Sequence, residues 1–165
     1  MRFRLTQKLA KKLNLMDLSR TDSHDSGSAW YGNLFRVGGV QYILLTESLT
    51  LFSFLFYGRG IVDAAALTTK AKLLIETKFK ENGWLSVLGK PISYDLAAPT
   101  LLAAQDRSVL SSMNGMVGLL RAQLELGKRD IEFLSNEINI VPFTKNGVMN
   151  NSDSRVEQLA KAQKR

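Results

Sequence analysis

The sequence predicts an α+β fold, in which an antiparallel sheet of four to five strands packs against three to four helices. Two apolar, strand-like runs flank a Gly-Gly pair and a third apolar run follows, which indicates an antiparallel meander over residues 30–57. Apolar residues recur at helical spacing in residues 63–82 and in residues 108–126. The chain has 165 residues, 45% of them hydrophobic, so we expect one domain with its own core over residues 1–165.

Two further strands are expected beside the meander, one near residues 2–5 and one near residues 100–104. The first alternates polar and apolar side chains from Arg2 to Leu5, which is the period of a half-buried strand. The second is a short apolar run that follows Pro99. With the meander they complete the sheet of four to five strands.

Capping residues and glycines mark the ends of the predicted helices. Gly83 and Gly127 end the two long helices, because glycine tolerates the left-handed backbone conformation that follows a helix. Thr6 can cap a short helix after the first strand, and Asp130 can cap one in the last third of the chain.

The segments between these elements are expected to be irregular. Residues 19–29 are small and polar and predict a mobile loop, and residues 144–152 predict a second polar loop. Ser154 and Glu157 have the spacing of a capping box, which predicts a final helix. The basic C-terminus is expected to fray.

The one histidine, His24, lies between Asp22 and Asp25 in the first of these loops. Such side chains can ligate a metal, but no second histidine supports a site. A solvated loop histidine is therefore the favoured interpretation, and we expect no metal and no cofactor. The same isolation argues against a Ser–His hydrolase.

Composition restricts the classes of function. The formal net charge is +7, which favours an acidic macromolecule as partner, although such charge can also serve solubility alone. The absence of cysteine excludes disulfides, thiolate nucleophiles and cysteine zinc knuckles. The N-terminus lacks the apolar core of a signal peptide, and the most apolar run, residues 42–57, is too short to span a bilayer. We therefore expect a cytoplasmic protein with no membrane partner.

The first twenty residues form the densest basic segment of the chain. They contain a single acid, Asp17, against six basic residues, namely Arg2, Arg4, Lys8, Lys11, Lys12 and Arg20. These side chains can follow a phosphate backbone. The alternative is that they form the solvated face of a short helix.

A polar turn between the predicted strand at residues 100–104 and the long helix that follows is the candidate site. Asp106 and Ser108 can cap the helix, Arg107 can bind a carboxylate or phosphate through two N–H groups, and Asn114 lies one to two turns further on. The functional interpretation is an anion pocket at the helix N-terminus. The alternative is a helix cap in which Arg107 pairs with a structural carboxylate.

Five segments together resemble a known pattern. They are Phe3-Arg-Leu-Thr-Gln-Lys-Leu, Trp30-Tyr-Gly-Asn-Leu, Thr50-Leu-Phe-Ser-Phe-Leu, Asp106-Arg-Ser-Val-Leu-Ser-Ser-Met-Asn114 and Glu137-Ile-Asn-Ile-Val-Pro142. In order and spacing they resemble a bacterial family catalogued as domain of unknown function sixty-nine thirty-three. The resemblance implies no activity, cofactor or partner.

The leading functional hypothesis is a small, non-enzymatic basic protein that contacts nucleic acid or a ribonucleoprotein. A first alternative is a mobile-element or phage-type inhibitor that blocks a host defence machine by protein–protein contact. A second is an enzyme that acts on a phosphorylated small molecule at the turn formed by residues 106–114. Salt-dependent binding separates the first hypothesis from the others, because counterion release dominates binding to nucleic acid.

Overall fold

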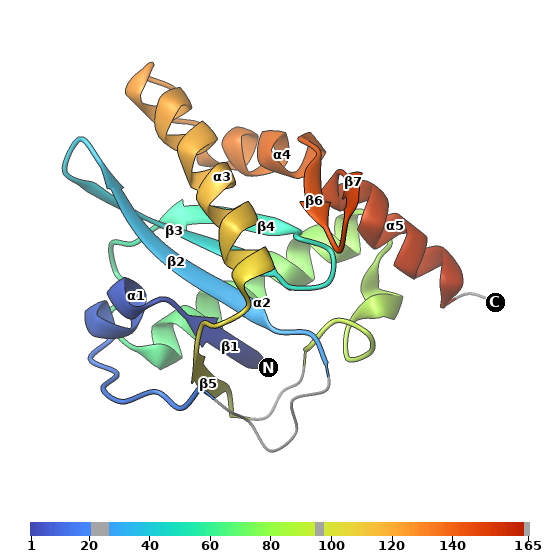
Figure 1. The fold of residues 1–165 in the computed structure, drawn as a ribbon, viewed down its shortest axis with the longest axis horizontal. Helices are drawn as coiled ribbons and strands as arrows, with labels where there is room; N and C mark the ends of the chain where they lie inside the picture. Colours follow the sequence, from blue (N-terminus) through green and yellow to red (C-terminus); the bar gives the residue numbers. More distant parts are fainter. Residues whose placement is uncertain (21–26, 95–97, 164–165) are drawn as a thin grey trace.

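A five-stranded sheet forms the centre of the molecule, in the order β4-β3-β2-β1-β5 (Figure 1). The computed structural model describes residues 1–20, 27–94 and 98–163. The strands are β1 (Arg2–Leu5), β2 (Trp30–Val37), β3 (Val40–Glu47), β4 (Ser53–Tyr57) and β5 (Thr100–Ala103). The predicted α+β class and the predicted meander, which is β2-β3-β4, are confirmed.

The sheet is mixed, so the expectation of a wholly antiparallel sheet is wrong. Strand β1 pairs in parallel with both β2 and β5. A tight Gly-Gly turn dictates antiparallel pairing within the meander, but a strand joined to its neighbour through a helix can return in parallel. Helix α1 (Gln7–Lys12) provides this connection between β1 and β2. Side-chain alternation in a four-residue strand carries no information on its direction.

Helices cover both faces of the sheet, as Figure 1 shows. Helices α1, α2 (Ala64–Glu81) and α5 (Ser152–Ala162) contribute to one apolar cluster, and α3 (Arg107–Glu125) and α4 (Ile131–Ile140) contribute to the other. A short 3-10 helix, η1 (Leu85–Val87), adds to the first cluster. Because each strand alternates its side chains, Ile43 of β3 enters the first cluster and Leu44 enters the second.

Aromatic contacts order the first cluster. The rings of Phe52, Phe79 and Trp84 meet edge to face, with centroid separations of 5.5 to 5.7 Å. Such pairs contribute about 0.5–1.5 kcal/mol each beyond the burial of their area. They fix the end of α2 against the turn that leads into β4.

Side-chain caps explain where most helices begin. Asp63 accepts from the Ala66 amide at 2.8 Å to start α2, and Asp130 accepts from the Phe133 amide at 2.9 Å to start α4. The predicted cap by Thr6 is wrong, because its side chain makes no capping hydrogen bond.

The C-terminal region differs from the sequence prediction. Most of the predicted loop at residues 144–152 belongs to the hairpin of β6 (Phe143–Lys145) and β7 (Val148–Asn150). Its turn is Asn146-Gly147, with φ values of 52° and 78°, and this dipeptide favours such a turn. Helix α5 begins at Ser152 under an Asn151 cap, not at the predicted capping box.

Parts of two further predictions lie outside the described residues. These are the residues of the predicted mobile loop that include His24, and the last two basic residues of the C-terminus. At the end of that predicted loop, Ser28 and Ala29 are buried. Among the described residues, no helix combines the length and the apolar character that crossing a membrane requires.

The outer edge of β4 is covered by side chains of α4. The Asn139 side chain accepts from the Ser53 amide and donates to the Ser53 carbonyl, both at 2.7 Å, and all three groups are buried. The Ser135 hydroxyl accepts from the Leu55 amide at 3.1 Å. The carboxamide thus satisfies the same backbone groups that a neighbouring strand would satisfy.

We predict that Asn139→Ala lowers the free energy of unfolding by about 2–4 kcal/mol, because the buried amide and carbonyl of Ser53 lose their partner. Asn136→Ala, at an exposed position of the same helix, is the control and should change it by less than about 0.5 kcal/mol. Urea denaturation measures both values. Equal effects of the two substitutions would contradict this role of Asn139.

Candidate functional site

The parallel strands β1 and β5 end at the same edge of the sheet, where their following segments diverge. Helix α1 follows β1 and packs into one apolar cluster, whereas α3 follows β5 and packs into the other. In open sheets, ligands commonly bind outside the carboxyl ends of parallel strands where the connections leave on opposite faces. A cavity of about 920 Å³ lies at this position. We call it the strand-end crevice; it is lined by Leu5, Gln7, Ala10, Lys11, Leu15, Met16, Asp17, Leu18, Arg20, Ala103, Ala104, Gln105, Arg107 and Leu110.

The charges that line the crevice are mainly positive. Lys11, Arg20 and Arg107 stand against one acid, Asp17. Arg107 is exposed in the first turn of α3 and makes no hydrogen bond or ion pair within the described part of the chain. All three cations are exposed, and a cleft lined by one sign of charge raises the local concentration of the opposite ion.

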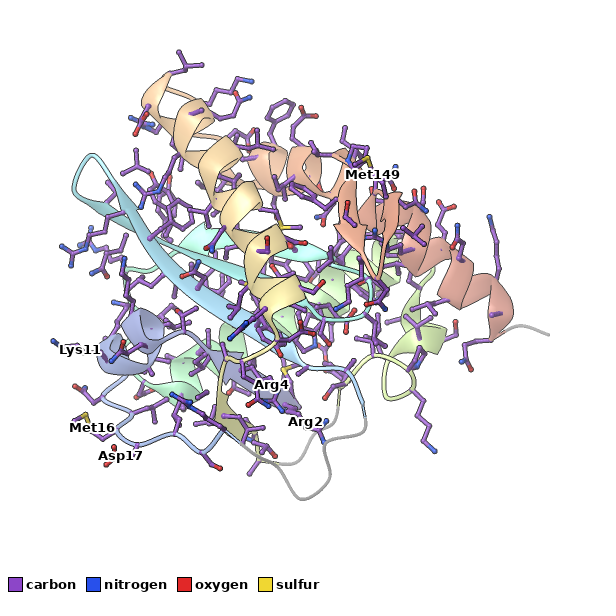
Figure 2. All side chains as sticks on the ribbon, viewed as in Figure 1. Arg2, Arg4, Lys11, Met16, Asp17 and Met149 are labelled. Atoms are coloured by element: carbon purple, nitrogen blue, oxygen red, sulfur yellow. The ribbon has the colours of Figure 1, made fainter. Side chains whose placement is uncertain are left out.

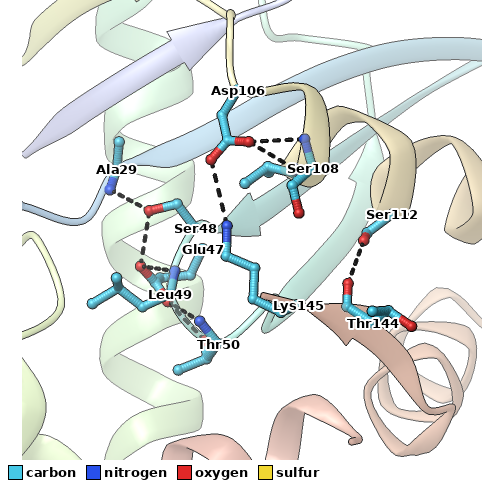
Figure 3. A network of polar contacts seen from close by, with 11 residues as sticks. Ala29, Glu47, Ser48, Leu49, Thr50, Asp106, Ser108, Ser112, Thr144 and Lys145 are labelled. Atoms are coloured by element: carbon cyan, nitrogen blue, oxygen red, sulfur yellow. Dashed lines mark hydrogen bonds and ion pairs between the residues drawn. The ribbon is translucent and has the colours of Figure 1, made fainter. Parts of the chain in front are cut away.

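Asp106 caps α3 and pairs with Lys145 (Figure 3). Its carboxylate accepts from the Ser108 amide at 2.8 Å and the Val109 amide at 3.3 Å, and the Lys145 ammonium lies 3.4 Å away. Partial burial by itself would raise the pKa of Asp106, but the Val109 amide, the Lys145 charge and the Ser108 amide together bring the pKa below its ordinary value. Two amides of the α3 N-terminus are therefore already occupied, so the site offers an outside anion the Arg107 side chain and not the helix end itself.

Ser108 and Asn114 do not share the strand-end crevice with Arg107. Neither lines the crevice, and both are exposed. Ser108 lines a smaller hollow beside β6 with Ser112, whose hydroxyl donates to the Thr144 carbonyl at 3.1 Å (Figure 3).

The basic residues of the N-terminal segment do not form one surface. Arg4 is only 4% exposed, and its guanidinium donates to the carbonyls of Arg20 and Ala103, both at 3.3 Å. Arg4 therefore holds the segment that carries Arg20 against β5. Figure 2 shows Lys11 on the outer side of α1, apart from Arg2 and Arg4, which belong to β1.

The two remaining lysines of α1 lie outside the crevice lining. Lys8 is exposed, and Lys12 donates to the Gln41 side chain at 2.8 Å. Sequence reasoning included Arg20 among the basic residues but not in the site, and it did not identify Lys145. No local pattern marks either residue, because their positions depend on contacts with β5 and α3.

A buried carboxylate, that of Glu47, closes the turn between β3 and β4 (Figure 3). It is 0% exposed and accepts from the Thr50 amide and hydroxyl, both at 2.8 Å, and from the Leu49 amide at 3.0 Å. Burial raises the pKa of Glu47 above its ordinary value of 4.5, against the lowering effect of these hydrogen bonds. The residue orders the turn and faces no described cation within salt-bridge distance.

Within the described ranges, no group of three or more His, Asp or Glu side chains is arranged to hold a metal ion. His24, which the sequence indicated as a solvated loop histidine and not a metal ligand, lies outside these ranges.

A family model described as Domain of unknown function (DUF6933) matches residues 2–154. No curated protein and no solved structure matches the chain.

We predict that Glu47→Gln changes how stability depends on pH. The folded-state pKa is raised, so the wild-type carboxyl contributes most below pH 4.5, and that contribution is lost as the pH rises through the folded-state pKa. The wild-type free energy of unfolding, minus that of the variant, should therefore fall with rising pH. Urea denaturation at a series of pH values tests this. A difference that stays constant or grows with pH would contradict it.

Proposed function

The chain belongs to the DUF6933 family, whose description names no activity, and from its own residues we propose that it is a non-enzymatic protein that binds phosphates of a nucleic acid in the strand-end crevice. The proposal rests on one observation above all. Three cations from three separate segments, Lys11, Arg20 and Arg107, converge on one cavity beside a single carboxylate.

The chemistry of these side chains suits phosphate. A guanidinium presents several N–H donors in a plane and can bind two phosphate oxygens at once, and an ammonium adds a compact point charge. Arg107 supports this role because it has no partner among the described residues and stands at the crevice wall, with no bond to break before it binds.

A polymer fits better than a free phosphate. Lys8 is exposed on α1 just outside the crevice lining, and the whole chain carries a formal net charge of +7. Charge beyond the cavity attracts neighbouring phosphates of one strand and releases their counterions. A phosphorylated small molecule would use the same crevice but gain little from this outer charge.

The inhibitor hypothesis stays a prediction, and no residue of the crevice argues for it.

We predict that Arg107→Ala and Lys11→Ala each weaken binding of single-stranded RNA or DNA by about tenfold, the usual effect of losing one charged hydrogen bond. Each should also reduce the slope of log affinity against log salt by about one. Fluorescence anisotropy over a salt series measures both quantities.

Lys80→Ala, at an exposed position of α2 outside the crevice, is the control and should leave both quantities nearly unchanged. Adenosine monophosphate and inorganic phosphate are the competing probes for the small-molecule alternative. If no oligonucleotide binds at low salt, the proposal is wrong. If Arg107→Ala lowers the melting temperature markedly, Arg107 is instead a structural residue.

A further inference from the structure

Only half of the outer edge of β4 has its backbone N–H and C=O groups hydrogen-bonded to the rest of the described chain. The Gly58 amide donates to the Gln41 carbonyl, and the Glu47 amide donates to the Phe52 carbonyl. These bonds identify the alternate residues near β4 whose backbone groups face β3. Alternation then points the backbone groups of Ser53, Leu55 and Tyr57 outward. Helix α4 bonds both groups of Ser53 and the amide of Leu55. The Leu55 carbonyl and the Tyr57 amide have no hydrogen-bond partner in the part of the chain that the structure describes.

Leu55 and Tyr57 both line a groove of about 760 Å³ between α2 and α4. We call it the edge groove. One wall is a continuous face of α2, on which Leu73 and Leu74 lie next to each other, and the other wall includes Ile131 of α4. Leu73 is 58% exposed, so an occupant of the groove can bury it.

The open half of the groove carries more positive than negative charge. Arg59 follows β4 and Lys70 lies in the second turn of α2, whereas Glu132 of α4 is the acid at this end. Neither Arg59 nor Lys70 has a hydrogen bond or ion pair among the described residues. Of the other charged residues in the lining, Lys78 and Glu81 of α2 offset each other in formal charge.

The two helices that wall the groove, α2 and α4, limit what can reach β4. An added strand needs to reach β4 between two helices, and a single extended segment is narrow enough to do so. A second copy of this chain would present its own β4 edge between its own α2 and α4, so four helices would meet before the two edges paired. The geometry therefore favours a segment of another protein.

We propose that the edge groove binds an extended segment of a partner protein, which adds to β4 as a sixth strand. Its backbone bonds to the Leu55 carbonyl and the Tyr57 amide, as in other cases of strand addition. Its apolar side chains pack against Leu73 and Leu74, and an acidic side chain pairs with Arg59 or Lys70. This site is separate from the strand-end crevice and holds whether or not the crevice binds nucleic acid.

Panning a phage-displayed library of random heptapeptides against the full chain tests the proposal. The enriched peptides should alternate apolar and polar residues and include Asp or Glu. Leu73→Glu and Lys70→Glu should each lower their affinity by about tenfold or more, because each places a carboxylate against an acidic, apolar ligand. Two versions of a bound peptide, methylated at alternate backbone nitrogens, should behave differently. The version methylated at the N–H groups that face β4 should not bind, and the other should bind, because only alternate N–H groups face β4.

Leu119→Glu, at a leucine of α3 that is 46% exposed outside the groove, is the matched control and should leave peptide affinity unchanged. Circular dichroism verifies that each variant is folded. The proposal is overturned if the library yields no enriched peptide, or if Leu119→Glu weakens binding as much as Leu73→Glu. It is also overturned if sedimentation shows a dimer that Leu73→Glu dissociates, because a second copy would then be the occupant.

Discussion

The parallel pairing of β1 with β5 is the constraint on which the crevice depends. The pairing aligns Arg2 with Thr100 through Leu5 with Ala103, so both strands end together. Backbone bonds continue it beyond the strands, from Thr100 to Met1 at 3.0 Å and from Ala104 to Leu5 at 2.9 Å. If β5 ran the other way, Arg107 would lie about 13 Å away, at the opposite end of a four-residue strand. Lys11 and Arg107 line one cavity because of this direction.

The molecule uses its charged side chains in two ways. Arg4 binds backbone carbonyls, Lys145 binds the Asp106 carboxylate, and Glu47 binds the amides of its own turn. Arg4 and Glu47 are buried, so removing a partner of either would leave a buried polar atom unsatisfied. Arg107, in contrast, has no partner in the described ranges. The buried charges fix the backbone, and they leave the exposed cations free to bind a ligand.

Local signals predicted a large part of the fold. The Gly38-Gly39 turn identified the meander, and helical periodicity ended by Gly83 and Gly127 identified α2 and α3. The hairpin β6-β7 was missed although Asn146-Gly147 marks it, because its strands are only three residues long.

The candidate site was less predictable, because it depends on contacts between distant segments. Alternation predicted an outward Arg4, but β1 lies between β2 and β5 and is covered on both faces, so the guanidinium is buried. Asp106 and Arg107 were recognised as neighbours in the sequence. The cap by Asp106 was one of the roles expected from the sequence. The place of Arg107 in the crevice follows only from the pairing of β5 with β1.

Mapping amide chemical shifts during titration with a short single-stranded oligonucleotide tests the central claim most directly. The account predicts that the first resonances to move belong to Gln7, Lys11, Gln105 and Arg107, at the ends of β1 and β5, while those of Leu73 and Leu74 in the edge groove stay in place. Shifts confined to another face, or no shifts at low salt, would contradict the assignment of this crevice as the phosphate site.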